Sequence, residues 1–123
     1  MMQPSEHEEQ CALMQWWALA RVRFGVPEHL LFAIPNGGLR NSIVAARMKA
    51  EGVRAGVPDL FLAVPRGGFA GLFIEMKKRK GGVFSEYQKA MMADLAAQGF
   101  RVVGCHGWCE AKTEILSYLE LGK

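Results

Sequence analysis

The sequence lacks several features that would place it in whole classes of proteins. Three cysteines in 123 residues cannot all pair with one another, which excludes a disulfide-built secreted scaffold and indicates free thiols in a reducing compartment. No apolar run approaches the roughly 20 residues that a membrane-spanning helix needs. The first ten residues, MMQPSEHEEQ, are polar and acidic and do not resemble a signal peptide. We therefore expect a cytoplasmic protein without a membrane partner.

Internal repeats, low-complexity tracts and linker-like stretches are also absent from the sequence, so we expect one domain over residues 1–123. Half of the residues are hydrophobic, which is enough for a sizeable core. The net charge of +3 is a mild basic excess that permits a polyanionic partner such as nucleic acid but does not require one. Neither a P-loop nor a Rossmann fingerprint occurs, and we expect no small-molecule cofactor.

Hydrophobic periodicity and turn residues predict four helices and four strands. Ser5 with Glu8, and Ser85 with Gln88, have the spacing of a capping box and open two of the helices. The predicted helices cover about 6–24, 41 or 42 to 51, 85–98 and 109–121, and the predicted strands cover 29–35, 59–64, 71–77 and 100–105. Because the strands are apolar on both faces, helices are needed on both sides of the sheet. The sequence therefore predicts an α/β fold with a mixed central sheet flanked by helices.

Three charged residues lie in the two strands that have the clearest strand pattern. Asp59 opens the strand 59–64, and Glu75 and Lys77 lie inside the strand 71–77. Side chains alternate between the faces of a strand, so Glu75 and Lys77 point the same way. If the two strands form a hairpin, Asp59 lies near the end of the second strand and the three charges converge. Two neighbouring carboxylates repel each other, and a divalent cation that prefers oxygen ligands, Mg²⁺ or Mn²⁺, would remove that repulsion.

A simpler interpretation of these residues has no site at all. Asp59 after Pro58 could begin a turn, and Glu75 with Lys77 could be a solvated pair on an edge strand. The apolar run Leu72-Phe73-Ile74 argues against a solvated edge. A Pro-Asp pair at the head of the preceding strand also makes the combination rarer than a lone E-x-K pattern.

The segment Cys105-His106-Gly107-Trp108-Cys109 suggests a zinc site at first sight. It offers three possible ligands, whereas a structural zinc site uses four, and the remaining cysteine and histidines are far away in sequence. We therefore interpret Cys105, at the end of a buried strand, as a small hydrophobic residue.

Pro58-Asp59 followed by Glu75-Met76-Lys77 resembles the PD-(D/E)xK nuclease signature. The fuller order is Gly56-Val57-Pro58-Asp59, then Glu75-Met76-Lys77, then Ser85 and Gln88 at the start of a helix. This order resembles the VRR-NUC (virus-type replication–repair nuclease) domain, especially its small stand-alone phage and bacterial members. The resemblance covers nearly the whole chain, because Ile34-Pro35-Asn36-Gly37-Gly38 and the Glu/Gln-rich first helix also fit.

The resemblance implies a restriction-endonuclease-like fold and metal-dependent hydrolysis of phosphodiester bonds. Asp59 and Glu75 would bind Mg²⁺ or Mn²⁺ together with the backbone carbonyl of Met76, and Lys77 would be the catalytic lysine. A glutamate of the first helix often completes the acidic site in this family, and Gln88 lies beside it. The first turn offers four candidates, of which we prefer the one directly before Gln10; they are Glu6, His7, Glu8 and the preferred Glu9.

A basic loop follows the proposed catalytic lysine. Lys78, Arg79 and Lys80 would contact DNA phosphates in a nuclease, whereas such a run on its own is more often a solvated charged surface. Similar proteins carry the loop that contains Asn36 near the active site, so Asn36 is expected to contact a phosphate. Arg40 would extend the path of the DNA.

The resemblance further implies a homodimer, which would place two sites on the two strands of a branched duplex. We expect structure-specific cleavage of Holliday junctions or flaps in phage or bacterial replication and repair, inside a bacterial cell or a phage-infected host. A small domain without an obvious recognition module offers little base-specific readout, so we expect it to recognise the shape of DNA and not its sequence. The alternative is a non-catalytic or partner-dependent nucleic-acid-binding module of the same fold.

Overall fold

The computed structural model describes residues 2–35 and 41–122 and follows the sequence-based prediction closely. Every predicted helix and strand is present, with bounds that agree within two residues. The predicted strand over 29–35 is shortened at both ends, and a 3-10 helix precedes it. In chain order the elements are α1 (Glu6–Phe24), the 3-10 helix (Glu28–Leu30), β1 (Leu31–Ala33), α2 (Ser42–Ala50), β2 (Leu60–Leu62), β3 (Leu72–Lys77), α3 (Glu86–Ala97), β4 (Arg101–His106) and α4 (Trp108–Leu119).

Local signals define the ends of α1 and the start of α3. In both predicted capping boxes, the hydroxyl of the serine accepts from the amide three residues later, and the side chain there accepts from the serine amide. These pairs are Ser5 with Glu8 and Ser85 with Gln88. Gly25 ends α1 in the left-handed conformation, with φ of 67°, which a residue without Cβ adopts at little cost.

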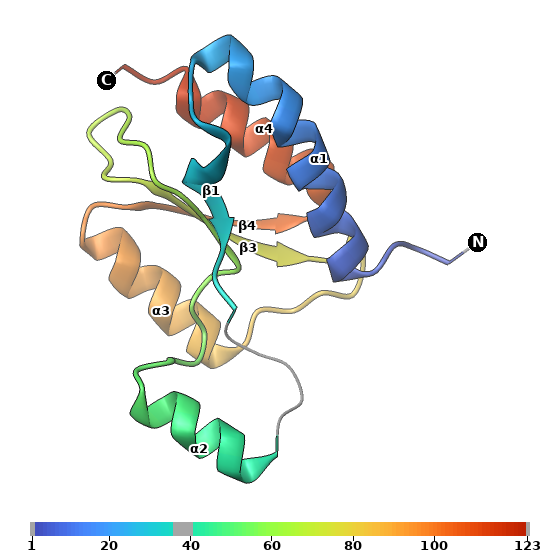
Figure 1. Ribbon diagram of the computed structural model, residues 1–123, viewed down its shortest axis with the longest axis vertical. Helices are drawn as coiled ribbons and strands as arrows, with labels where there is room; N and C mark the ends of the chain where they lie inside the picture. The colour runs from blue at the N-terminus through green and yellow to red at the C-terminus, as the bar shows by residue number, and fades with distance from the viewer. Residues whose placement is uncertain (1, 36–40, 123) are drawn as a thin grey trace.

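The four strands form one mixed sheet in the order β1-β2-β3-β4. β2 is antiparallel to both of its neighbours, and β3 runs parallel to β4 through the crossover that contains α3. Leu60 pairs with Ile74, and Leu62 pairs with Leu72, which confirms the predicted hairpin. Figure 1 shows α1 and α4 side by side on one face of the sheet and α3 on the other. The predicted mixed sheet with helices on both sides is therefore confirmed.

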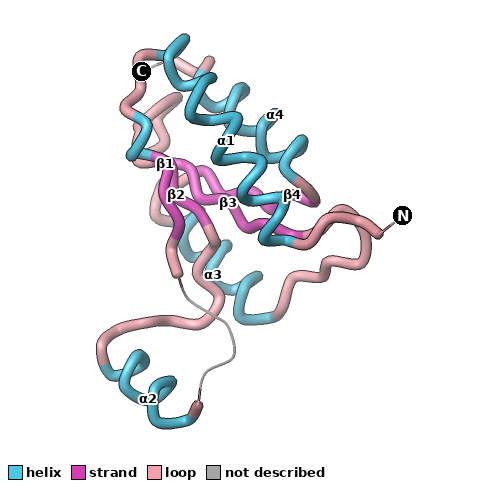
Figure 2. The backbone as a smooth tube through the Cα atoms, turned by 45° about the vertical axis from the view of Figure 1, so that its right-hand side comes forward, coloured by secondary structure: helices cyan, strands magenta, loops and turns pink. Residues whose placement is uncertain are grey.

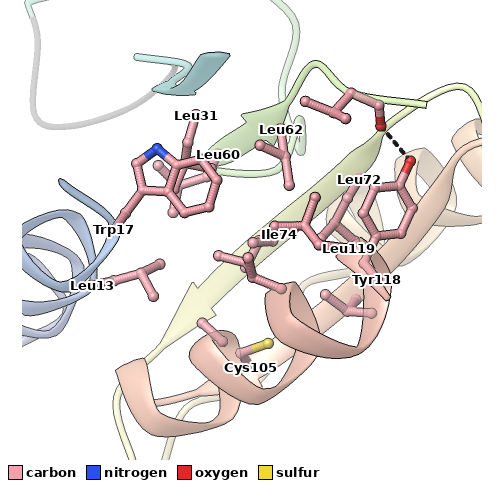
Figure 3. Packing of buried hydrophobic residues seen from close by; sticks show 14 of the residues in the cluster. Leu13, Trp17, Leu31, Leu60, Leu62, Leu72, Ile74, Cys105, Tyr118 and Leu119 are labelled. Carbon is pink, nitrogen blue, oxygen red and sulfur yellow. Dashed lines mark hydrogen bonds between the residues drawn. The ribbon is translucent and has the colours of Figure 1, made fainter. Parts of the chain in front are cut away.

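The main core lies between the sheet and the pair α1 and α4 (Figure 3). The ring of Trp17 is fully buried there, and its indole N–H donates to the carbonyl of Glu28 over 2.9 Å. The Tyr118 hydroxyl donates to the Val64 carbonyl over 2.6 Å, so the polar ends of both aromatic residues are satisfied. Every second residue of β3 contributes to this core, namely Leu72, Ile74 and Met76.

The opposite face of β3 carries Phe73, Glu75 and Lys77. Phe73 joins an aromatic cluster with Phe61 and Phe100, in which ring centroids lie 4.3–5.9 Å apart. This cluster fills the part of that face next to the start of β4. Glu75 and Lys77 follow on the same face toward the carboxyl end of β3, as predicted from strand alternation.

Figures 1 and 2 show α2 beyond α3 and apart from the sheet, and no residue of this helix is buried. Within the described ranges, no helix is both long and apolar enough to cross a membrane. The three cysteines are free thiols. Cys105 is buried, as expected of a small hydrophobic residue, and burial raises the pKa of its thiol to about 12.

Candidate active site

The pairing of β2 with β3 places Asp59 beside Glu75 and Met76 of β3. Asp59 directly precedes β2, so the register that pairs Leu60 with Ile74 places Asp59 opposite Glu75 one step further along. Its Oδ2 atom accepts from the backbone amide of Met76 over 2.7 Å. The predicted convergence of the two carboxylates at one end of the sheet is therefore present in the structure.

Glu75 is the central side chain of this cluster. Only 3% of the residue is exposed, although it carries a carboxyl group. Its Oε2 atom accepts from the Nε2 atom of Gln88 over 3.0 Å and lies 3.8 Å from the Nζ atom of Lys77. Four of the sequence-predicted residues are thus brought together: Asp59 directly before β2, Glu75 and Lys77 on β3, and Gln88 on α3.

The capping box of α3 also orients Gln88 toward the site. The Oε1 atom of Gln88 accepts from the Ser85 amide over 2.9 Å, and this bond leaves the Nε2 atom directed at Glu75. Gly56 allows α3 to come this close. Its φ is +85°, and an added Cβ would lie 2.4 Å from the Tyr87 carbonyl oxygen, so no larger side chain fits there.

The pKa of Glu75 is raised to about 8. Burial is the largest cause, and the charge of Asp59 and a hydrogen bond with Asp59 raise the pKa further, while the charge of Lys77 lowers it. The site therefore holds two carboxyl groups where one alone is already costly to ionise. A divalent cation between them would favour the ionised forms of both.

Asp59, Glu75 and the backbone of Met76 form an oxygen-rich donor set that fits Mg²⁺ or Mn²⁺. The Lys77 carbonyl accepts from the Gly107 amide next to β4. Because backbone groups alternate sides along a strand, the amide and carbonyl of Met76 turn toward Asp59 instead. Among the described residues no three His, Cys, Asp or Glu side chains lie close enough to hold one ion. The ligands of one ion would therefore be the two carboxylates, the Met76 carbonyl and water molecules.

Glu9 lies in the first turn of α1. It is buried, its Oε2 atom lies 2.7 Å from the Nε atom of Arg79, and its Oε1 atom accepts from the Trp108 amide over 3.1 Å. Both oxygens thus join α1 to the basic loop and to the start of α4. The part that Glu9 was expected to take in metal binding stays a prediction. One turn earlier in α1, the charge of Glu6 is the smallest of the causes that raise the pKa of Glu75.

The basic loop is exposed at all three predicted DNA-contacting positions, Lys78, Arg79 and Lys80. Its backbone is held by distant residues: the side chain of Gln3 both donates to and accepts from the backbone of Lys80, and His106 Nδ1 lies 3.2 Å from the Lys78 carbonyl. The loop therefore presents its charged side chains from a fixed backbone. The other two predicted DNA contacts, Asn36 and Arg40, lie outside the described residues.

Sequence reasoning missed the contacts that fix this arrangement across long chain separations. Glu6 was one of four first-turn candidates, and no spacing rule separated it from Glu9. The close approach at Gly56 was signalled only by its place in the Gly-Val-Pro-Asp motif.

The sequence matches the family profile described as "VRR-NUC domain" over residues 2–108. A solved structure titled "VRR_NUC domain protein" is 27% identical in sequence, with a TM-score of 0.85; the match covers 100% of this chain and 94% of that chain. No protein with curated annotation matches.

Proposed function

Because the chain belongs to the VRR-NUC family and has its nuclease fold, we propose that it is a Mg²⁺- or Mn²⁺-dependent DNA endonuclease that hydrolyses phosphodiester bonds. The observation that carries the proposal is the contact set of buried Glu75, which meets Asp59, Lys77 and Gln88 at one end of the sheet. If Glu75 and Lys77 formed only a structural ion pair, the second carboxyl group of Asp59 would serve no purpose there, because burial already raises the pKa of Glu75.

In the proposed reaction, Asp59, Glu75 and the Met76 carbonyl would hold the cation. When bound, such an ion acidifies a water molecule and neutralises charge that develops on the phosphodiester. Gln88 keeps the Glu75 carboxylate in place through its amide. The ammonium of Lys77 orients the attacking water or stabilises the negative charge of the transition state.

Branched DNA is the substrate class that we propose, with cleavage of junctions or flaps in replication and repair. Support comes from the small size of the domain and from a basic loop that offers phosphate contacts beside the site. A homodimer would place two such sites on the two strands of a branch, and we include that assembly in the proposal.

A cleavage panel tests the proposed function directly. The purified protein is incubated with four-way junction, flap, duplex and single-stranded DNA, each with Mg²⁺, with Mn²⁺ or with EDTA. We expect metal-dependent cutting that favours the branched substrates and stops in EDTA. A protein that retards junctions in a gel but cuts none of the substrates with either metal would be the non-catalytic binding module instead. Sluggish cutting that a partner protein accelerates would identify a partner-dependent subunit.

Replacing both Lys78 and Lys80 by alanine is expected to weaken DNA binding and its dependence on salt. Each phosphate contact releases close to one counterion, so the slope of log K against log salt should become shallower by about 1–2. The measurement is a binding titration with a four-way junction over a series of salt concentrations. Arg79 is left intact because its removal would strand the buried carboxylate of Glu9.

Lys112→Ala is the matched control for this double variant, because Lys112 lies on α4, across the sheet from α3. Its titration should follow that of the unmodified protein. An unchanged salt slope in the Lys78/Lys80 variant would remove the loop from the DNA interface.

A further inference from the structure

The aromatic ring of Phe84 lies at the edge of the candidate site. Phe84 follows the basic loop and directly precedes Ser85, the N-cap of α3. Its ring packs on the backbone of Gly104 in β4, the residue that pairs with Glu75 in the sheet. A Cβ added at Gly104 would come within 2.3 Å of the ring, so the glycine creates the room that the ring fills.

Two side chains from neighbouring strands contact this ring. The Nζ atom of Lys77 lies over the ring, 5.7 Å from its centroid, within the range of a cation–π interaction. The imidazole of His106, which pairs with Lys77 in the sheet, meets the ring edge-on with a centroid distance of 5.6 Å. The ring of Phe84 is therefore held between β3, β4 and the start of α3.

The Lys77 side chain is confined on more than one side. It is 12% exposed, and its ammonium lies 3.8 Å from the carboxyl group of Glu75. On another side Gly82 is so close that a Cβ added there would lie 2.7 Å from the Cβ of Lys77. A lysine has four rotatable bonds and would otherwise sample many positions. An aromatic face attracts the ammonium without accepting a conventional hydrogen bond, so the three N–H donors remain free for Glu75, water and a phosphate oxygen.

We propose that Phe84 is a positioning residue for Lys77. Its ring holds the ammonium at the end of the sheet beside Glu75, in the place from which it acts on the scissile phosphate. Gly104 and Gly82 belong to the same arrangement. Gly104 lets the Phe84 ring pack on the backbone of β4, and Gly82 lets the loop lie against Lys77, where a larger residue would clash. The inference rests on the proposed nuclease function, since it assigns Phe84 a role through the proposed catalytic lysine.

Two variants disturb the ring from opposite sides. Phe84→Leu removes the ring but keeps an apolar side chain, and Gly104→Ala keeps the ring but displaces it. Since a displacement of about 1 Å at a reacting group can cost on the order of a hundredfold, we expect kcat for a four-way junction to fall about 10- to 100-fold in both variants. The Kd for the same junction, measured with Ca²⁺ in place of Mg²⁺, should stay within about twofold.

The matched control is Phe100→Leu, which removes a ring from the aromatic cluster on the same face of the sheet. It should lower thermal stability by a similar or larger amount, yet leave kcat unchanged at temperatures where all variants are folded. An equal loss of kcat in Phe100→Leu would show that Phe84 acts only through general stability, and would overturn the proposal.

An NMR measurement reads the contact without any nuclease assay. The ε-methylene resonances of Lys77, assigned by their absence in Lys77→Ala, should be shifted upfield by the Phe84 ring and should move downfield in Phe84→Leu. Loss of this shift without a change in kcat would overturn the positioning role, and so would an unshifted resonance in the unmodified protein. If the unmodified protein cuts no DNA with either metal, the proposed function fails, and the positioning role fails with it even where NMR shows the contact.

Discussion

Asp59→Asn and Lys77→Ala are each expected to lower the rate of metal-dependent DNA cleavage by about 10²–10³-fold or more, with the fold intact. Asparagine keeps an oxygen that can accept from the Met76 amide, but it lacks the negative charge with which Asp59 attracts the cation. Lys77→Ala removes the ammonium beside Glu75 and leaves the backbone bond to Gly107 unchanged. The measurement is single-turnover cleavage of a four-way junction, with circular dichroism and thermal unfolding as the tests of folding.

Asp94→Asn and Lys89→Ala are matched controls for these two variants, because both residues are exposed on α3. They remove the same kinds of charge without touching Glu75, and they should cleave DNA like the unmodified protein. Full activity of Asp59→Asn or of Lys77→Ala, at normal stability, would show that the reaction takes place elsewhere.

Glu75→Gln is expected to abolish cleavage and, in the absence of metal, to make the protein more stable than the unmodified chain above pH 8. The pKa of Glu75 is raised from 4.5 to about 8 in the folded protein, so between these values the folded state holds a proton that the unfolded chain has released. Stability therefore falls as the pH rises through this range, by a few kcal/mol in total, since one pKa unit corresponds to about 1.4 kcal/mol. Glutamine mimics the protonated carboxyl group and removes this loss.

Thermal unfolding in EDTA between pH 5 and pH 9 measures the effect. The melting temperature of the unmodified protein should fall relative to that of Glu75→Gln as the pH rises, and excess Mg²⁺ should raise the melting temperature of the unmodified protein only. Glu86→Gln, at an exposed glutamate on α3, is the control and should follow the unmodified protein. Parallel pH profiles for Glu75→Gln and the unmodified protein would show that burial and Asp59 do not perturb Glu75.

The carboxylates of the first helix could not be told apart by sequence reasoning. Glu6 and Glu9 are three residues apart, so they point only about 60° apart around the helix, and helical phase does not distinguish them. The difference arises from residues far away in the chain, because Arg79 and the Trp108 amide take up both oxygens of Glu9. Phe84 is a similar case, since its role depends on a glycine that lies twenty residues later in the sequence.

By itself, the sequence determined the helices and strands, the β2–β3 hairpin and the meeting of Asp59 with Glu75 and Lys77. These features follow from capping spacings, hydrophobic periodicity and the alternation of side chains along a strand, all of which act over a few residues. Only the tertiary structure decided that Glu9 holds the basic loop and that an aromatic ring lies against Lys77. Those contacts join elements distant in the chain, and their geometry is set by how the helices pack on the sheet.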